Sequence, residues 1–283
     1  MNYRHGFHAG NHADVLKHVV LVAILDALAA KPKPLSVLDT HAGRGAYALD
    51  GEQARRTGES EGGIDRLRAA PQRLREVPAI ARYLDCVDGL EPDGSGARYP
   101  GSPWIAATAT GPEDRIACCE LEPGEHAALR ALMAGDPRVA VHRRDGYEAL
   151  RALLPPTPRR GLVLVDPPYE AQLAEFDTVL SGLREAMGRW PQGVYALWYP
   201  IKQRRELHGV MRRLARLPAT SILCAELLVR PDDSPLRLNG SGMLVFNPPW
   251  RLHEALAPAL AALREALDEG GASTRLEWLK PPA

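Results

Sequence analysis

Long apolar runs, paired cysteines and an excess of charge of one sign are all missing from this chain of 283 residues. The longest unbroken aliphatic run, Val19 to Leu25, is far too short to span a bilayer. No apolar stretch with a cleavage site stands near the N-terminus, so we expect a cytoplasmic protein with no membrane partner. Lys plus Arg is 35 and Asp plus Glu is 35, which argues against coating nucleic acid by bulk charge but allows a local basic patch.

Cysteine is scarce and unpaired in the sequence. The four cysteines are Cys86, Cys118, Cys119 and Cys224, with no Cys-x-x-Cys pair among them. Adjacent Cys118 and Cys119 would point to opposite faces of a strand. We therefore expect reduced, mostly buried thiols in a cytoplasmic protein. Hydrophobic residues make up 45% of the chain, enough for a real core in one large domain or two small ones.

Short apolar runs alternate with amphipathic segments along most of the chain. A first helix is predicted from Val15 to Leu28, with Asn11 and Asp14 as a capping pair. Strands are predicted at 35–40, 115–119, 139–142, 162–165, 194–198, 222–229 and 243–246, with helices at 124–134, 146–154, 172–190 and 203–217. This alternation predicts an α/β fold with a mostly parallel sheet, in which the last two strands form an antiparallel hairpin.

The stretch from 46 to 98 departs from this alternation. It contains charged, helix-like segments and a proline break near Pro71, and no convincing strand. We interpret 46–98 as an inserted helical subdomain. Residues 1–45 would then hold an N-terminal tail, the first helix and the first strand of the main domain, and residues 99–283 would hold its remainder.

Acids and glycines follow three of the predicted strands, where an open α/β sheet binds its ligands. Asp39 precedes a turn with Gly43 and Gly45, which suits a ligand loop or plain packing. Glu120 could bind both hydroxyls of a ribose, or it could be an acid at a helix N-terminus. The pair Asp145-Gly146 could accept from an adenine amino group, or Asp145 could simply cap the next helix.

The strongest signal is the run Asp166-Pro167-Pro168-Tyr169 after a buried strand. Two successive prolines make a stiff bend that presents the Asp166 carboxylate and nearby carbonyls as acceptors. Tyr169 would add a flat ring for stacking. Acceptors and a ring are what the exocyclic amine of a planar base requires, although a strand-ending proline turn is the plain alternative.

This run, after a glycine turn and an acid that suits ribose, resembles the S-adenosylmethionine-dependent amino-methyltransferases. More closely, the chain resembles the RlmJ family, which methylates N6 of one adenine in 23S ribosomal RNA. The matching blocks follow the family's order and lie at 3–18, 38–43, 99–103, 166–169, 196–200 and 241–250. Nothing inside these blocks removes a functional position, whereas the stretch 46–98 is less similar.

The resemblance implies a Rossmann-like class I methyltransferase fold with an inserted helical subdomain and an N-terminal tail that folds over the cofactor. It makes Asp166 the catalytic acceptor and Tyr3 a contact to the RNA, and we expect Lys17 to help hold the cofactor carboxylate. The partner would be 23S ribosomal RNA, naked or early in assembly, and the enzyme a monomer. S-adenosylmethionine is expected against His18, His41, Ser102, Glu120, Asp145, Gly146 and Asp166.

Other motifs give weaker indications. The histidines His5, His8 and His12 have no cysteine or dense acid cluster around them, so we expect no metal site. The turn from Asn247 to Trp250 is interpreted as a wall of the active site. Tyr195, Trp198 and Tyr199 would be mostly core, although Trp198 or Tyr199 could line the base pocket.

One predicted helix carries a basic stripe. Its members occupy about 100° of a helical wheel opposite an apolar side, and they are Lys202, Arg205, Arg212, Arg213 and Arg216. Such a stripe suits RNA phosphates or a merely solvated helix face.

Three rival functions remain at this point. A DNA adenine-N6 methyltransferase shares the Asp-Pro-Pro-Tyr chemistry and would prefer duplex DNA. A protein-glutamine methyltransferase usually has Asn at the position of Asp166, so this acid argues against it. A non-catalytic RNA-binding protein would bind RNA without S-adenosylmethionine, which the acids Asp39, Glu120 and Asp166 disfavour.

Overall fold

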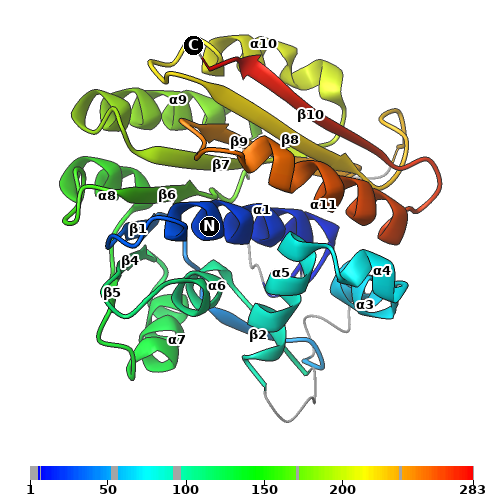
Figure 1. Cartoon of the computed structure of the whole chain (residues 1–283), viewed down its shortest axis with the longest axis horizontal. Helices are drawn as coiled ribbons and strands as arrows, with labels where there is room; N and C mark the ends of the chain where they lie inside the picture. The colour runs from blue at the N-terminus through cyan, green and yellow to red at the C-terminus, as the bar shows by residue number, and fades with distance from the viewer. Residues whose placement is uncertain are drawn as a thin grey trace.

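An eight-stranded sheet forms the centre of the molecule (Figure 1). The computed structural model describes residue 6 and residues 8–51, 57–91, 97–169, 172–235 and 238–282. The strand order is β10-β8-β9-β7-β6-β1-β4-β5. These strands are β1 (Ser36–Asp39), β4 (Arg115–Cys119), β5 (Val139–His142), β6 (Gly161–Val165), β7 (Val194–Ile201), β8 (Ile222–Leu228), β9 (Gly240–Phe246) and β10 (Ser273–Lys280).

The sheet is parallel from β5 to β7 and antiparallel from β7 to β10. The predicted α/β class, the mostly parallel sheet and the hairpin of β8 and β9 are therefore confirmed. Two elements near the C-terminus were not predicted: a helix, α11 (Leu252–Ala266), and the edge strand β10. β10 begins with three polar residues and none of its residues is buried, so the apolar pattern of a central strand is missing.

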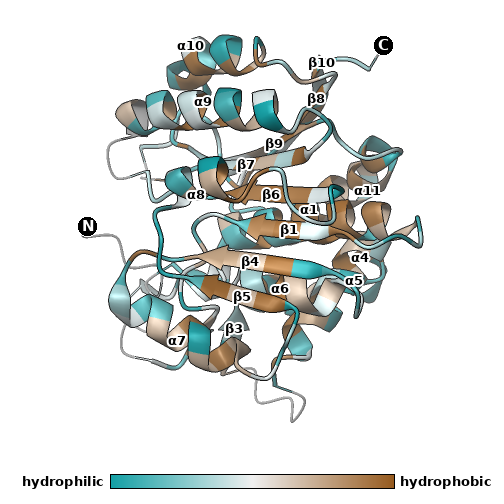
Figure 2. Cartoon of the chain, turned by 90° about the vertical axis from the view of Figure 1, so that its left-hand side faces the viewer, coloured by the Kyte–Doolittle hydropathy of each residue, from teal (hydrophilic) through white to brown (hydrophobic). Residues whose placement is uncertain are grey.

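Helices cover both faces of the sheet. One hydrophobic cluster joins the first face to α1 (His12–Ala29), α3 (Ile64–Ala69), α4 (Gln72–Arg75), α5 (Pro78–Asp88), α6 (Ser102–Ala109), α7 (Pro123–Met133) and α11. A second cluster joins the other face to α8 (Gly146–Ala152), α9 (Gln172–Arg189) and α10 (Arg204–Leu214). Figure 2 shows the hydrophobic strands β1 and β6 between these layers.

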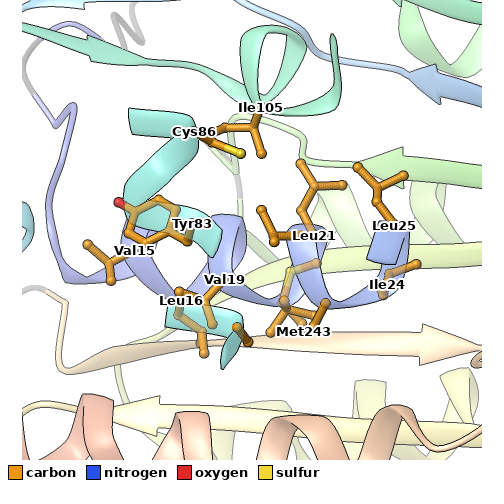
Figure 3. Packing of buried hydrophobic residues seen from close by; sticks show 14 of the residues in the cluster. Val15, Leu16, Val19, Leu21, Ile24, Leu25, Tyr83, Cys86, Ile105 and Met243 are labelled. Carbon is orange, nitrogen blue, oxygen red and sulfur yellow. The ribbon is translucent and has the colours of Figure 1, made fainter. Parts of the chain in front are cut away.

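Helix α1 lies inside the molecule and not on its surface. The Asn11 side chain caps it by accepting from the amides of Ala13 and Asp14, each at 3.0 Å, as predicted for Asn11. Its side chains pack on several sides at once, against Met243 of the sheet and against Tyr83 of α5 (Figure 3). A helix that is apolar all round is stable only when it is buried in this way.

Strand pairing brings the candidate acids to one edge. Strand β1 lies between β4 and β6, all three parallel, so the residues that follow them meet at their carboxyl ends. Thr40 continues β1, donating its amide at 3.1 Å and its hydroxyl at 2.9 Å to the carbonyl of Leu164. The strands of this sheet that follow β1 in the sequence lie on both sides of it: β4 and β5 on one side, β6 and β7 on the other. The order of the strands therefore reverses at β1, and such a topological switch point is where open α/β sheets bind ligands.

The stretch 46–98 contains more than helices. A second sheet pairs β2 (Ala46–Ala48) with β3 (Arg98–Pro100), so the expectation of no strand there is wrong. The strands were missed because each is three residues long, too short to show an alternation. Helices α3, α4 and α5, with the short 3-10 helix η2 (Glu59–Gly62), share the hydrophobic cluster of α1 or border it. The division at residues 46 and 98 stays a prediction.

The turn from Asn247 to Trp250 lies away from the catalytic edge, so its interpretation as a wall of the active site is wrong. Strand β9 runs antiparallel to β7 and ends at Phe246, opposite Tyr195 near the start of β7. Asn247 accordingly donates to the carbonyls of Pro191 and Gly193, each at 2.9 Å, before β7 begins. The Trp250 side chain is 87% exposed at that far edge.

The cysteines are free thiols, and all four are buried. Cys118 belongs to the cluster on one face of the sheet and Cys119 to the cluster on the other, as their adjacent positions on a strand predicted. Across the described residues, no helix has the length and apolar character that crossing a membrane requires.

Candidate active site

The carboxylate of Asp166 stands at the end of β6 with a buried lysine against it. Lys17 Nζ lies 2.7 Å from Asp166 Oδ2 and 2.8 Å from Asp14 Oδ1, and the lysine is 4% exposed. Burial acts to lower the pKa of Lys17, but the two carboxylates outweigh it and hold this pKa well above its usual value. The ammonium is thus a permanent cation that fixes one oxygen of Asp166. No other described residue donates to Asp166, so Oδ1 is available to a ligand.

Aromatic rings flank this carboxylate. The Tyr169 hydroxyl donates to the carbonyl of Trp198 at 2.8 Å, and the two ring centroids are 5.7 Å apart. Tyr169 has a φ of 25°, a strained value that the double proline and this hydrogen bond hold in place. Lys17 Nζ lies 5.8 Å from the centre of the Trp198 ring. Asp166, Tyr169 and Trp198 therefore form one polar and aromatic corner, whereas Tyr199 is buried elsewhere, against Glu226.

The glycine turn after β1 binds Glu120. Gly43 donates its amide to Glu120 Oε2 at 2.9 Å, and the amide of Glu122 donates to Oε1 at 2.8 Å. Gly43 has a φ of +60°, and a Cβ on it would come within 2.2 Å of the Tyr47 hydroxyl. Burial raises the pKa of Glu120, and the hydrogen bonds from these amides oppose the rise. Glu120 is therefore a fixed, half-buried carboxylate at the end of β4.

Asp39 and Ser102 form a buried hydrogen-bonded pair at the end of β1. The Ser102 hydroxyl at the start of α6 donates to Asp39 Oδ2 at 2.6 Å, and the amide of His41 donates to Oδ1 at 3.3 Å. Burial raises the pKa of Asp39 to about 6, which Ser102 opposes and the nearby Asp166 reinforces. Burial also lowers the pKa of His41, so its imidazole is neutral near pH 7.

His18 is held by two tyrosines. Its Nδ1 lies 2.8 Å from the Tyr99 hydroxyl, and that hydroxyl lies 2.9 Å from the Tyr83 hydroxyl. The His18 and Tyr99 rings stack with centroids 5.6 Å apart. Tyr99 belongs to β3, directly after the stretch 46–98, and Tyr83 belongs to α5 within it, so 46–98 acts on this histidine of the predicted cofactor site through Tyr99.

The start of α8 closes the site beside β5. Asp145 caps α8, because its Oδ1 accepts from the amides of Tyr147 and Glu148 at 2.8 Å and 3.0 Å. The helix cap predicted as an alternative for Asp145 is therefore present, and it uses one of the two carboxylate oxygens. Gly146 touches the first strand so closely that a Cβ would lie 2.2 Å from the Thr40 carbonyl oxygen. A cavity of about 830 Å³ opens beside Asp145, lined by Leu121, Arg143, Arg144, Asp145, Tyr147, Glu148 and Thr178.

Comparison with known proteins identifies the family. The model of the family described as "Ribosomal RNA large subunit methyltransferase D, RlmJ" matches residues 32–280. The chain belongs to the RlmJ family. Ribosomal RNA large subunit methyltransferase J of Escherichia coli is 40% identical over 99% of both chains, and the protein of that name from Haemophilus influenzae is also 40% identical over 99% of both. A crystal structure of a Legionella pneumophila protein shares 30% identity, with a TM-score of 0.86 over 95% of this chain and 98% of the other.

Membership of the RlmJ family confirms the Rossmann-like methyltransferase fold, and S-adenosylmethionine is the cofactor of this chain. The residues at the sheet edge fit that molecule. Asp39, Glu120 and Asp145 follow three neighbouring parallel strands, so their carboxylates can accept from an amine, from ribose hydroxyls and from an adenine amino group. An open depression in the surface lies beside Asp145 and Tyr147, at the end of β5.

Most of the predicted site residues converge on this edge. The structure brings together Lys17, His18, His41, Ser102, Glu120, Asp145, Gly146, Asp166 and Tyr169 around β1, β4 and β6. Tyr3 lies outside the described residues, and so does His5. Lys17 contacts Asp14 and Asp166, so its expected contact with the cofactor carboxylate stays a prediction. Among the described residues, no three His, Cys, Asp or Glu side chains form a group that could hold a metal.

Two supporting residues were missed by sequence reasoning. Asp14 was interpreted as a helix cap, and it does accept from the amide of Gly10 at 3.0 Å, but it also pairs with Lys17. The spacing of Asp14 and Lys17, three residues apart on a helix, could have indicated this pair. Tyr99 stands in a block quoted for the resemblance, yet nothing local in the sequence indicates its bond to His18.

Proposed function

We propose that this protein transfers one methyl group from S-adenosylmethionine to N6 of a single adenine in 23S ribosomal RNA, of the adenine-2030 type. The observation that carries the proposal is Asp166, which Lys17 fixes at the end of β6 beside Tyr169 and Trp198. A carboxylate oxygen and aromatic rings suit a flipped adenine, whose amino group needs an acceptor and whose ring needs a stacking surface.

In the mechanism that we propose, S-adenosylmethionine supplies an electrophilic methyl group on a sulfonium centre. Asp166 Oδ1 accepts a hydrogen bond from the adenine N6 and thereby orients the nitrogen lone pair for in-line transfer. Lys17 keeps Asp166 from rotating, because it binds the other oxygen at 2.7 Å. The adenine amine is barely basic, so the N6 proton leaves after the methyl group has been transferred. Tyr169 stacks on the base, and Tyr3 contacts the RNA.

The remaining site residues would bind the cofactor. We propose that Glu120 accepts from the ribose hydroxyls and Asp145 from the adenine amino group, with His18, His41, Ser102 and Gly146 against the rest of the molecule. The positions of Glu120 at the end of β4 and of Asp145 after β5 support this assignment. We further propose that the enzyme works as a cytoplasmic monomer on RNA that is naked or early in assembly.

Methyl transfer from labelled S-adenosylmethionine to protein-free 23S RNA tests the proposal, with the RNA prepared from cells that lack this enzyme. The expected result is N6-methyladenosine at one site after nucleoside analysis. Label in duplex DNA and none in RNA would replace the proposal with a DNA adenine-N6 methyltransferase. Binding of RNA without binding of S-adenosylmethionine would leave a non-catalytic RNA-binding protein.

Asp166→Ala separates chemistry from cofactor binding. Because Oδ1 is assigned to the adenine amine, the variant should lose turnover by on the order of 100-fold or more, since loss of such a group costs about that much. Its affinity for S-adenosylmethionine, measured by calorimetry, should change much less. Single-turnover methylation close to that of the wild type would remove Asp166 from its catalytic role.

A further inference from the structure

A groove lies between α10 and the edge strand β10, away from the methyl-transfer site. It has a volume of about 920 Å³. Figure 1 shows α10 above β8 and β10 at one end of the sheet. The wall that α10 contributes consists of Arg204, Leu207, His208, Met211, Arg212 and Ala215, and the floor consists of Glu226, Thr274, Arg275, Glu277 and Leu279.

The basic groups of the wall follow one side of α10. Arg204, His208 and Arg212 are four residues apart, so they are neighbours on the helix at steps of about 6 Å along its axis. Consecutive phosphates of a polynucleotide strand have a spacing of the same order. Arg212 is exposed and has no ion pair within the described part of the chain. The groove therefore presents Arg212, without an ion pair in the described ranges, next to His208 and Arg204 on the same side of α10.

The acids of the groove are already neutralised. Glu226 is 1% exposed, accepts from the Tyr199 hydroxyl at 2.9 Å and from Arg204 Nε at 2.8 Å, and has Arg275 Nη1 at 3.6 Å. Glu277 pairs with Arg275. Arg204 Nη2 is buried and has no hydrogen-bond partner in the described ranges. Glu226 thus fixes the Arg204 guanidinium while leaving part of its donor capacity unused.

The groove is connected to the active site through the sheet. Tyr199 follows Trp198, whose carbonyl holds Tyr169, and Tyr199 stands in register with Gly242, Glu226 and Arg275 across β7, β9, β8 and β10. Three strand spacings of about 4.8 Å each separate Tyr199 from Arg275, a distance of roughly 14 Å. One RNA molecule can therefore reach both places.

We propose that the α10–β10 groove binds the sugar–phosphate backbone of the RNA substrate at nucleotides that flank the target adenine. This inference rests on the proposed function and adds to it the surface that holds the RNA. Arginine recognises phosphate with two parallel hydrogen bonds, and such contacts position a nucleic acid without reading its sequence. Three further exposed members of the stripe, Lys202, Arg205 and Arg216, extend the same field on α10 and beyond its two ends, whereas Arg213 pairs with Asp177.

The test compares Arg212→Glu with Arg264→Glu in the full-length protein. Arg264 is an exposed arginine on α11, on the opposite face of the sheet, so it controls for the change in net charge. Removing a phosphate contact should raise the Kd for protein-free 23S RNA by on the order of tenfold and reduce the slope of log Kd against log salt by about 1. Arg212→Gln should give an intermediate Kd.

All three variants should keep the kcat of the wild type at saturating RNA and its Kd for S-adenosylmethionine, because Arg212 is outside the catalytic machinery. If Arg212→Glu and Arg264→Glu have equal RNA affinity and equal salt slope, the groove does not bind the RNA. The proposed function would survive that result as long as the wild type methylates RNA. A wild type that neither binds nor methylates RNA would overturn the proposed function and the groove together.

Discussion

Lys17 is the cation that pairs with two carboxylates of the site, those of Asp14 and Asp166. It separates the carboxylates of Asp14 and Asp166 at 2.8 Å and 2.7 Å in a buried position. Lys17→Met would leave these two acids facing each other without a cation. Breaking a buried ion pair from one side costs about 3–5 kcal/mol, so we expect urea denaturation to show a loss of stability of that order. Turnover should fall as well, because Asp166 is then no longer held.

Lys31→Met is the matched control, because Lys31 is exposed just beyond the end of α1. Its stability and methylation rate should equal those of the wild type. If Lys17→Met behaves like this control in both measurements, Lys17 does not orient Asp166.

His12 gives the fold a dependence on pH. Burial lowers the pKa of His12 to about 4, and its Nδ1 has no hydrogen-bond partner in the described part of the chain. Because the unfolded chain binds this proton with the ordinary histidine pKa of 6.5, the contribution to stability is complete above pH 6.5 and is lost as the pH falls toward 4. The loss should be on the order of 3 kcal/mol.

His12→Gln removes the titrating group while keeping a polar side chain of similar size. The difference in unfolding free energy between wild type and variant, measured by urea denaturation at pH 7.5 and at pH 4.5, should shift in favour of the variant at the lower pH. A difference that is the same at both pH values would show that His12 does not titrate differently in the two states.

Among the elements, α8 starts in the most confined turn of the site. A Cβ on Gly146 would meet the Thr40 carbonyl oxygen at 2.2 Å and His41 Cε1 at 2.9 Å. We expect Gly146→Ala to push α8 away from β1, with a loss of about 1–3 kcal/mol in stability and weaker binding of S-adenosylmethionine. Calorimetric titration measures the binding. Gly135→Ala, where nothing lies within 4 Å, should bind the cofactor normally.

The elements also show which parts of the fold could be predicted from the sequence. The strands β4, β6 and β7 are apolar runs, and the acids after β1, β4 and β6 follow from that pattern and from the parallel sheet. The place of Asn247 could also have been derived, because the helix after β7 makes β8 run parallel to β7, and the hairpin partner β9 then returns the chain to the opposite edge of the sheet. Its Pro-Pro-aromatic turn looks like Asp166-Pro167-Pro168-Tyr169 in sequence, but this likeness does not indicate at which edge of the sheet the turn lies.

The side-chain pairs of the site could not be predicted in the same way. Lys17 and Asp166 are 149 residues apart, and His18 and Tyr99 are 81 apart. No local pattern encodes such a pair, since each depends on how α1 crosses the sheet and on where β3 lies. The sequence therefore indicated which residue types carry the chemistry, whereas their partners came only from the assembled fold.

At the scale of the whole molecule, α1 joins the stretch 46–98 to the catalytic edge. It packs against α5, α6, α11 and β9, and Figure 3 shows it beside Tyr83 of α5, Ile105 of α6 and Met243 of β9. It also carries Lys17 and His18. Tyr99 makes a second connection, because its hydroxyl forms hydrogen bonds with the Tyr83 hydroxyl and with His18 Nδ1. Because 46–98 shares this core with the sheet, we expect the two to unfold together.

Ile80→Ala tests this coupling, because Ile80 lies on α5 with an exposed fraction of 0%. The cavity should cost about 2–5 kcal/mol. If 46–98 and the sheet are one cooperative unit, calorimetry shows a single transition at a lower Tm, and hydrogen exchange in β6 speeds up as much as in α5. Asp85→Ala, an exposed change on the same helix, should leave both unchanged. Two separate transitions, with β6 still protected, would instead make 46–98 an autonomous subdomain, and then Tyr99 would lose its hydrogen bond with Tyr83 without any loss of the sheet.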